Sequence, residues 1–293
     1  MKASIVIRTY NEERHLPKLL LAIAGQETKG LSHEVLVVDS GSTDKTLEIA
    51  GKHACRIIHI SKEEFTFGRS LNVGCREAAG EYLVFISGHC IPAHNKWLTN
   101  LISPLRKNKV AYTYGRQIGG PGSKFSECQL FAKYYPSTSM IPQEGFLCNN
   151  ANAALLRSAW EKMRFEEELT GLEDMLMGKQ LLASGMKLGY VADAEVQHIH
   201  DENWRKIRLR FEREALALQH IMPEIHLTFS DFFRYVTSSV LLDSSTALQE
   251  RKLLKCFPEI ILYRTMQFWG AYRGNRNHRK LSHEKKERYF YPR

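Results

Sequence analysis

Apolar and polar positions along the first hundred residues follow two alternating periods. Short, continuous apolar runs predict buried strands at 3–7, 34–38, 56–60 and 82–86. Between these runs, apolar side chains recur at helical spacing and predict helices near 16–23, 43–49, 69–79 and 97–105, the second one capped by Ser42. Strands that alternate with helices in this way predict an α/β fold with a mostly parallel, doubly wound sheet.

The pattern changes in the second half of the chain. The segment 115–144 predicts irregular structure, with loop residues at 119–122. A strand near 151–156, a helix near 172–183 and two short strands near 187–191 and 194–199 are predicted next. Beyond residue 201 the spacing is helical, with further helices near 229–242 and 246–272. We therefore expect an α/β domain over 1–200 and a helical C-terminal region over 201–293.

The net charge of +9 changes the view of that C-terminal region. Residues 201–293 hold 18 Lys and Arg against 11 Asp and Glu, so the rest of the chain is nearly neutral. Basic clusters at 205–210 and 273–280 accompany Phe268, Trp269 and Tyr272, a combination that suits a membrane interface. Apolar helix faces that meet in a homo-oligomer, or simply solvated helices, are alternatives.

The absence of a targeting signal in the sequence predicts a cytoplasmic protein. The basic C-terminal region adds the possibility of peripheral contact with the inner face of the cytoplasmic membrane. The sequence opens on a strand pattern rather than a secretory signal, and no run of 18 apolar residues predicts a spanning helix. The six cysteines form no C-x-x-C pair, so a zinc ribbon or redox motif is not indicated.

Five motifs stand in a fixed order along the chain. They are SIVIRTYNE at 4–12, VVDSGSTD at 37–44, YLVFISGHCIP at 82–92, Glu173-Asp174, and His198-x-His200. This order resembles the family 2 glycosyltransferases with the GT-A fold. Phe67-Gly68-Arg69, Asn72 and Gly115-Arg116-Gln117 resemble the bacterial rhamnosyltransferase-like branch of that family. The resemblance covers about residues 3–200.

The resemblance implies an inverting transfer of a sugar from a nucleotide-diphosphate donor to the hydroxyl of a glycan or lipid-linked acceptor. Such a reaction would build a bacterial surface polysaccharide such as capsule, O-antigen or lipooligosaccharide. The expected site residues are Asp174 as general base with Glu173 beside it; Thr9, Tyr10, Asn11, Glu12 and Asp39 around the nucleotide; and Asn150 and Asn152 on the acceptor side. Trp97 or Trp160 could stack on a sugar ring, although Trp160 has the spacing of a core residue.

The residues themselves support parts of this site. The 9–12 loop and Asp39 follow neighbouring strands, and ligands of α/β sheets bind at the carboxyl ends of strands. Asp174 and Glu173 diverge by roughly 100° on a helix, so one can face a cleft while the other is anchored. Helix capping and favourable N-terminal charge are the structural alternatives. Arg69 and Arg116 are candidates for the donor diphosphate, with plain surface charge as the alternative.

Ser87-Gly88-His89 stands where the family usually has Asp-x-Asp, so His89 occupies the position of a metal-binding aspartate. Three interpretations follow. In the first, His89 and His198, with His200 as a weaker candidate, hold a divalent cation; imidazole favours Mn²⁺ over Mg²⁺. In the second, no metal is used, and His89, His200 and arginines neutralise the phosphates. In the third, the site binds without catalysis.

Other function classes fit the sequence less well. A nucleotidyltransferase would favour a Gly-rich basic loop after the first strand, and the 9–12 segment differs from that pattern. A noncatalytic nucleotide-sugar-binding protein remains an alternative. A nucleic-acid-binding protein is a further alternative, because the C-terminal region is basic. We nevertheless expect no nucleic acid among the partners. A dehydrogenase is disfavoured because no G-x-G-x-x-G follows the first strand.

Overall fold

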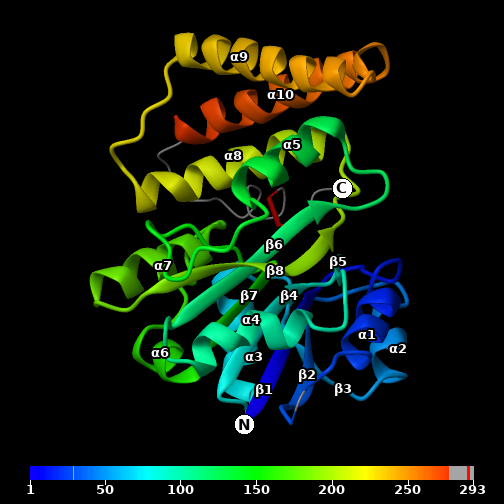
Figure 1. The fold of residues 1–293 in the computed structure, drawn as a ribbon, viewed down its shortest axis with the longest axis vertical. Coiled ribbons are helices and arrows are strands. Elements are labelled where there is room, and N and C mark those ends of the chain that lie inside the picture. Colours follow the sequence, from blue (N-terminus) through cyan, green and yellow to red (C-terminus); the bar gives the residue numbers. More distant parts are fainter. Residues whose placement is uncertain (29, 277–288, 291–293) are drawn as a thin grey trace. The chain divides into compact units, whose positions relative to one another are not determined.

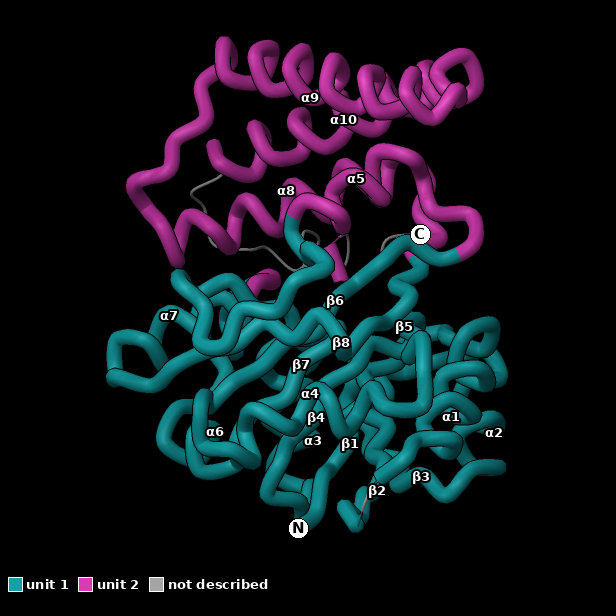
Figure 2. The backbone as a smooth tube through the Cα atoms, viewed as in Figure 1, with its two compact units in different colours: residues 1–120, 134–169, 173–199 teal, residues 121–133, 170–172, 200–293 magenta. Residues whose placement is uncertain are grey.

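The computed structural model describes residues 1–28, 30–276 and 289–290. The chain divides into two compact units (Figure 2). Unit 1 comprises residues 1–120, 134–169 and 173–199, and unit 2 comprises 121–133, 170–172 and 200–293. Unit 2 therefore includes two short segments that precede residue 200 in the sequence.

Unit 1 is built on one eight-stranded sheet (Figure 1). In spatial order the strands are β3 (Cys55–His59), β2 (Ser32–Asp39), β1 (Lys2–Thr9), β4 (Tyr82–Ser87), β7 (Asn152–Leu156), β6 (Tyr112–Gly119), β8 (Leu188–His198) and β5 (Cys90–Pro92). The strands β3, β2, β1 and β4 pair in parallel, as do β6 and β8, whereas β7 and β5 run antiparallel to their neighbours. The predicted mostly parallel sheet is confirmed.

Helices cover both faces of this sheet. On one face, α1 (Leu16–Ala24), α2 (Thr46–Gly51) and α4 (Trp97–Arg106) share a core with Ile5 and Ile7 of β1. On the other face lies α3 (Phe67–Glu77), where a β-carbon on Gly74 would come within 2.5 Å of Val6. Alternate residues of β1 therefore face different helix layers. The helices α6 (Arg157–Lys162) and α7 (Glu173–Ala183) complete the unit.

Unit 2 is helical. Its elements are α5 (Phe125–Tyr134), α8 (Trp204–Ile221), α9 (Phe229–Gln249) and α10 (Leu253–Asn275). The helix α10 packs on both α8 and α9. Gly270 and Gly274 allow α10 to approach α8 closely, since a β-carbon on either would lie within 2.3 Å of an α8 carbonyl oxygen. Among the helices described here, none combines the length and apolar character needed to cross a bilayer.

Four predicted details are wrong. The segment expected to be irregular contains β6 and α5, and the two short strands expected near 187–199 are one long strand, β8. The helix after β2 begins at Thr46 rather than Thr43, so Ser42 is not its cap. The break between the last two long helices lies near residues 250–252, because Asp243 is buried inside α9 and bonded to Arg264.

Candidate active site

The loops that follow β1 and β2 are joined by reciprocal hydrogen bonds. The Asn11 backbone N–H donates to Ser42 Oγ at 2.8 Å, and Asn11 Oδ1 accepts from the Thr43 N–H at 2.8 Å. The Glu12 N–H donates to Thr46 Oγ1 at 2.7 Å. Asn11 takes a positive φ of 55°, a conformation that asparagine tolerates better than most residues. The β1 loop is thus fixed in place, with Glu12 at its end.

Asp39, at the end of β2, is fully buried. Its Oδ2 accepts the N–H groups of Gly41 and Ser42, each at 2.9 Å, and its Oδ1 accepts the hydroxyls of Thr9 at 3.1 Å and Ser42 at 2.5 Å. Four donors fill the acceptor capacity of a carboxylate. A direct contact with a nucleotide would require a rotatable hydroxyl of Thr9 or Ser42 to turn away, so that role of Asp39 stays a prediction.

Tyr10, next to Thr9, packs its ring under the Lys62 ammonium, with Nζ 5.0 Å from the ring centroid. The aliphatic part of Lys62 also lies against Gly41, where a β-carbon would come within 3.3 Å. Lys62 therefore brings a positive charge to the two loops that are expected to surround the nucleotide. Its position in the sequence gave no signal of this placement.

The turn after β4 brings His89 against Glu12. Ser87 pairs with Arg8 at the end of β1, and His89 Nδ1 lies 2.6 Å from Glu12 Oε1. Gly88 makes this approach possible, because a β-carbon there would lie 2.8 Å from Glu12 Cγ. The end of β4 thus lacks a carboxylate of its own, but the β1 loop supplies one to its histidine.

His198, at the end of β8, stacks on His89, with ring centroids 5.1 Å apart and ring planes inclined by 20°. His198 Nδ1 lies 2.6 Å from Gln117 Oε1 on β6. An oxygen beside each Nδ1 favours the tautomer with the proton on Nδ1 and the lone pair on Nε2. The two rings are thus neighbours in unit 1, and the role of His89 and His198 as metal ligands stays a prediction.

His200 belongs to unit 2, where its Nδ1 lies 2.8 Å from Glu127 Oε1 on α5. Arg210 bonds the same carboxylate and also Glu202, at 2.9 Å each. Burial opposes ionisation of Glu202, but Arg210 and His200 outweigh it and lower its pKa to about 2. His200 therefore takes part in a partly buried charge cluster of unit 2, and its weaker role as a metal ligand stays a prediction.

Glu173 and Asp174 open α7, and both are buried. Arg8 of β1 binds Glu173, with Nη1 3.2 Å from Oε1. Asp174 Oδ2 accepts the Asn150 backbone N–H at 2.8 Å, and its Oδ1 accepts the Met175 N–H at 2.8 Å. Glu173 is therefore the carboxylate held by a salt bridge, whereas Asp174 is held only by neutral donors.

These surroundings set the proton affinity of Asp174. Burial, and then the negative charge of Glu173, raise its pKa from 3.8 to about 7, against the opposing effects of the Asn150 and Met175 N–H groups and of Arg8. A buried carboxylate beside a second one resists ionisation because its charge is desolvated and repelled. Of the two adjacent acids, Asp174 has the proton affinity of a general base at neutral pH.

The two predicted diphosphate arginines have partners in the protein. Arg69 Nη2 lies 3.0 Å from Glu64 Oε1, and both side chains are largely exposed. Arg116 Nη1 lies 2.8 Å from Glu195 Oε2, and Arg116 is the more sheltered of the two. An exposed pair exchanges partners at little cost, so a role for either arginine in binding phosphate stays a prediction.

The predicted acceptor contacts of Asn152 and Trp97 are wrong in this structure. Both are fully buried, and the Trp97 indole N–H donates to Asn152 Oδ1 at 2.8 Å. Asn152 Nδ2 donates to the carbonyls of Arg116 and Ala194. Asn152 therefore links β6, β7 and β8.

Two further residues of the predicted acceptor side are also internal. Trp160 is buried, as its spacing indicates, and its indole N–H donates to Asn72. Asn150 is buried too, and its Oδ1 accepts the Tyr112 hydroxyl at 2.5 Å. Asn150 contacts both acids of α7: its backbone N–H donates to Asp174 Oδ2 at 2.8 Å, and its Nδ2 donates to Glu173 Oε1 at 3.5 Å.

Two site residues, Arg8 and Gln117, were not predicted, although both lie within the quoted motifs. Only Arg8 carried a signal in the sequence. Arg8 interrupts an apolar strand run, and a charge at such a position needs a partner. Gln117 gave no such signal, because its segment was expected to be irregular and its burial on β6 appears only in the structure.

Comparisons with known proteins agree with this geometry. Residues 4–163 match the family model described as glycosyl transferase family 2. The O-antigen chain rhamnosyltransferase RfbN of Salmonella typhimurium strain LT2 is 26% identical over 293 residues, which cover 92% of this chain and 91% of that protein. The O-antigen chain rhamnosyltransferase WbaN of Salmonella anatum is 27% identical over 269 residues, covering 85% and 84%.

Solved structures show the same fold. The mannosyltransferase PcManGT from Pyrobaculum calidifontis, in complex with GDP-Man and Mn²⁺, superposes with a TM-score of 0.65 at 15% identity, covering 92% of this chain and 85% of that one. Glucosyl-3-phosphoglycerate synthase from Mycobacterium tuberculosis gives 0.57 at 20% identity, covering 75% and 79%. The predicted GT-A type of fold is confirmed, and the two Salmonella relatives agree with the predicted rhamnosyltransferase-like branch. The chain belongs to glycosyl transferase family 2.

Proposed function

We propose that this glycosyltransferase moves a sugar from a nucleotide-diphosphate donor to an acceptor hydroxyl with inversion at the anomeric carbon, during synthesis of a bacterial surface polysaccharide. The observation that carries the proposal is Asp174, a buried carboxylate whose pKa is raised to about 7 by burial and by Glu173. The names of the two Salmonella relatives support a rhamnosyl nucleotide as the first donor to test.

In the proposed reaction, Asp174 takes the proton of the acceptor hydroxyl as its oxygen attacks the anomeric carbon. The bond from that carbon to the donor phosphate breaks, and the nucleoside diphosphate leaves with the electron pair. Glu173 stays bound to Arg8 and keeps the pKa of Asp174 raised. The Asn150 N–H orients the carboxylate, and the fixed β1 loop with Asp39 forms the nucleotide side of the site.

The histidines fit a divalent cation. His89 and His198 offer ligand nitrogens that lie within 4.8 Å of each other, and each places Nδ1 on an oxygen. A carboxylate or amide behind a histidine is the usual support for a ligating imidazole. Such a donor set suits Mn²⁺ better than Mg²⁺. When bound, the cation would stabilise negative charge on the leaving diphosphate.

Melting temperatures measured with Mn²⁺, Mg²⁺ or chelator test this part without reference to activity. We expect Mn²⁺ to raise the melting temperature of the wild type more than Mg²⁺ does, and His89→Ala to remove that difference. Melting temperatures that neither cation changes, together with transfer that survives chelator, would favour the metal-free alternative, in which His89 and Arg116 face the phosphates.

The transfer itself is tested by incubating the protein with a rhamnosyl nucleotide and a glycan or lipid-linked acceptor. We expect release of free nucleoside diphosphate only when both are present, and a product whose anomeric configuration, read by NMR, is opposite to that of the donor. Retention of configuration would overturn the inverting mechanism. Donor binding without any release, over a panel of acceptors, would favour a noncatalytic binding protein.

A further inference from the structure

Unit 2 exposes aromatic side chains where α9 begins and α10 ends. We call this the aromatic surface; it consists of the exposed Phe229, Phe233 and Tyr235 on α9 and the half-buried Phe268, Trp269 and Tyr272 on α10. Phe229 is 51% exposed and Phe233 is 55% exposed. The ring centroids of Phe229 and Phe233 lie 4.9 Å apart, and those of Phe229 and Tyr272 lie 5.6 Å apart. Exposed apolar side chains gathered in this way mark an interaction site.

The charges around the aromatic surface are mainly positive. The Cζ atom of Arg234 lies 4.9 Å from the ring centroid of Tyr235, and that of Arg276 lies 5.5 Å from the ring centroid of Tyr272. The side chain of Arg234 is 66% exposed, and that of Arg273 is 45% exposed with its Nε 3.8 Å from Glu212 Oε1. The acidic residue in the first turn of α9, Asp231, is already paired with Arg234 at 2.8 Å. An apolar partner that carries negative charge therefore suits this surface, with the exposed Arg276 as its main contact.

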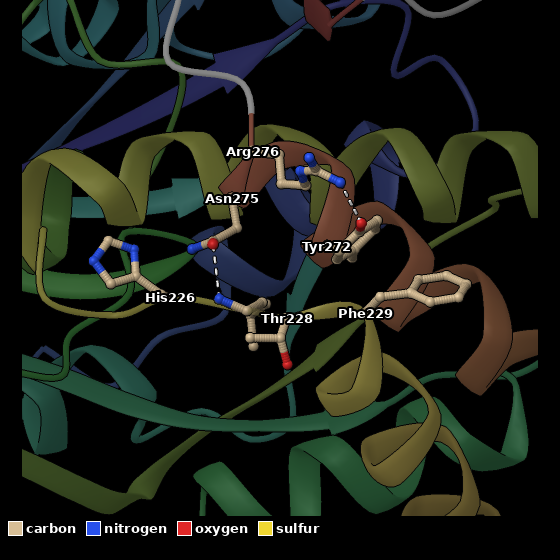
Figure 3. A pocket seen from close by; sticks show the side chains of 7 residues that line it. His226, Thr228, Phe229, Tyr272, Asn275 and Arg276 are labelled. Atoms are coloured by element: carbon tan, nitrogen blue, oxygen red, sulfur yellow. Dashed lines mark hydrogen bonds between the residues drawn. The ribbon is translucent and has the colours of Figure 1, made fainter.

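A cavity of about 330 Å³ opens beside the aromatic surface (Figure 3). Phe229 and Tyr272 line it, together with His226, Thr228, Asn275 and Arg276. The Arg276 guanidinium donates to the Tyr272 hydroxyl at 2.6 Å. Among the described residues that line the cavity, none is acidic. Its size and polarity suit one phosphate-bearing headgroup.

We propose that the aromatic surface docks on a bilayer of anionic phospholipid, with Phe233 entering the headgroup region and the cavity receiving a lipid phosphate. Aromatic rings and arginines side by side are typical of the membrane interface. A second copy of the chain fits less well, because a two-fold symmetric contact would bring the arginines of both copies together. This proposal does not rest on the transfer reaction.

The test is co-sedimentation of the full chain with phosphatidylcholine vesicles, with and without phosphatidylglycerol, at low and high salt. We expect binding only to the anionic vesicles, weakened by salt because screening reduces the attraction of the arginines. Phe233→Ser should weaken binding about tenfold. Arg234→Gln and Arg276→Gln should each weaken it about fivefold.

Matched controls are available in unit 1. Leu21, which is 64% exposed, and the exposed Lys18 allow the same changes in polarity and charge, as Leu21→Ser and Lys18→Gln. Neither control should alter binding. The proposal is overturned if the wild type stays in the supernatant at low salt, if it binds neutral vesicles equally, or if the controls weaken binding as much. A dimer in analytical ultracentrifugation that Phe233→Ser abolishes would also overturn it.

Discussion

The substitution Asp174→Asn tests the proposed base with little change of shape. Asp174 lies at the start of α7 and accepts the N–H groups of Asn150 and Met175 at 2.8 Å each. An asparagine side chain keeps the volume and one of the two acceptor oxygens, so the fold should persist. It cannot take a proton from the acceptor hydroxyl. The change therefore removes the proposed chemistry and leaves the nucleotide side of the site intact.

The expected loss is large in kcat and small in donor affinity. A positioned general base contributes about 10²–10⁴ in rate, which corresponds to about 3–5 kcal/mol of barrier. Nucleoside diphosphate release measures kcat, and titration calorimetry with the donor measures affinity. Turnover within tenfold of the wild type would refute the assignment of Asp174 as base. Loss of donor binding would instead indicate a damaged site.

The same variant tests the raised pKa through stability. The pKa of Asp174 in the folded protein lies near 7, above its ordinary 3.8. Its protonated form therefore adds stability that is fully present below about pH 4 and is lost as the pH rises through 7. The difference between the folded and the ordinary pKa corresponds to about 4 kcal/mol of stability between these two limits.

Urea unfolding of wild type and Asp174→Asn between pH 4 and 8 follows the contribution of Asp174 together with its neighbour Glu173, since the more distant groups cancel in the difference. We expect the free energy of unfolding of the wild type to fall relative to the variant by up to about 4 kcal/mol over that range. In parallel, kcat/KM of the wild type should rise with pH and level off above 7. A pH-independent difference in stability would show that the carboxylate is not perturbed.

Single contacts lead to three further predictions. Glu173→Gln removes the charge that opposes ionisation of Asp174, so the rising limb of the kcat/KM profile should move to lower pH; movement to higher pH would contradict this. Glu127→Gln leaves Arg210 with less compensation in its buried cluster and should cost about 3 kcal/mol in urea unfolding; a cost below about 1 kcal/mol would contradict the cluster's role. Gly68→Ala places a β-carbon 1.9 Å from a backbone oxygen and should cost about 1–3 kcal/mol; an unchanged melting temperature would refute that packing.

The parallel strands β3, β2, β1 and β4 were predictable from the sequence. Of these, β1 and β4 are buried on both faces of the sheet, so each one is a nearly continuous run of apolar residues. Strand β6 escaped prediction because it contains buried polar residues, such as Thr113, whose hydroxyl donates to the Leu101 carbonyl at 2.8 Å. Once satisfied by such a bond, a polar residue can lie in a core strand, but the sequence does not show the bond. The two segments of unit 2 that precede residue 200 were also invisible, because contacts between distant segments leave no periodic pattern.

The sequence predicted which residues lie at the candidate site, but it did not predict which residues bind one another there. Strand ends located the β1 loop, Asp39 and His89, and a helix start located Asp174. The partner of each side chain comes from an element distant in sequence, as when Arg8 binds Glu173 or Asn150 bonds Asp174. Such pairs depend on the strand order β1, β4, β7 and β6, which spacing along the chain does not encode. Asn152 shows the same limit, since only the fold reveals that it is an internal link.

If the site binds a diphosphate as proposed, the pairing of Glu12 with His89 explains how it does so without the usual aspartates at the end of β4. The carboxylate lies 2.6 Å from Nδ1 of the imidazole, so the negative charge sits behind the ring rather than at the strand end. Gly88 is required because any side chain there would displace Glu12. Phosphates would then meet an imidazole that has its carboxylate partner behind the ring. That arrangement repels them less than two aspartates would, so it can operate with a softer cation or with arginines alone.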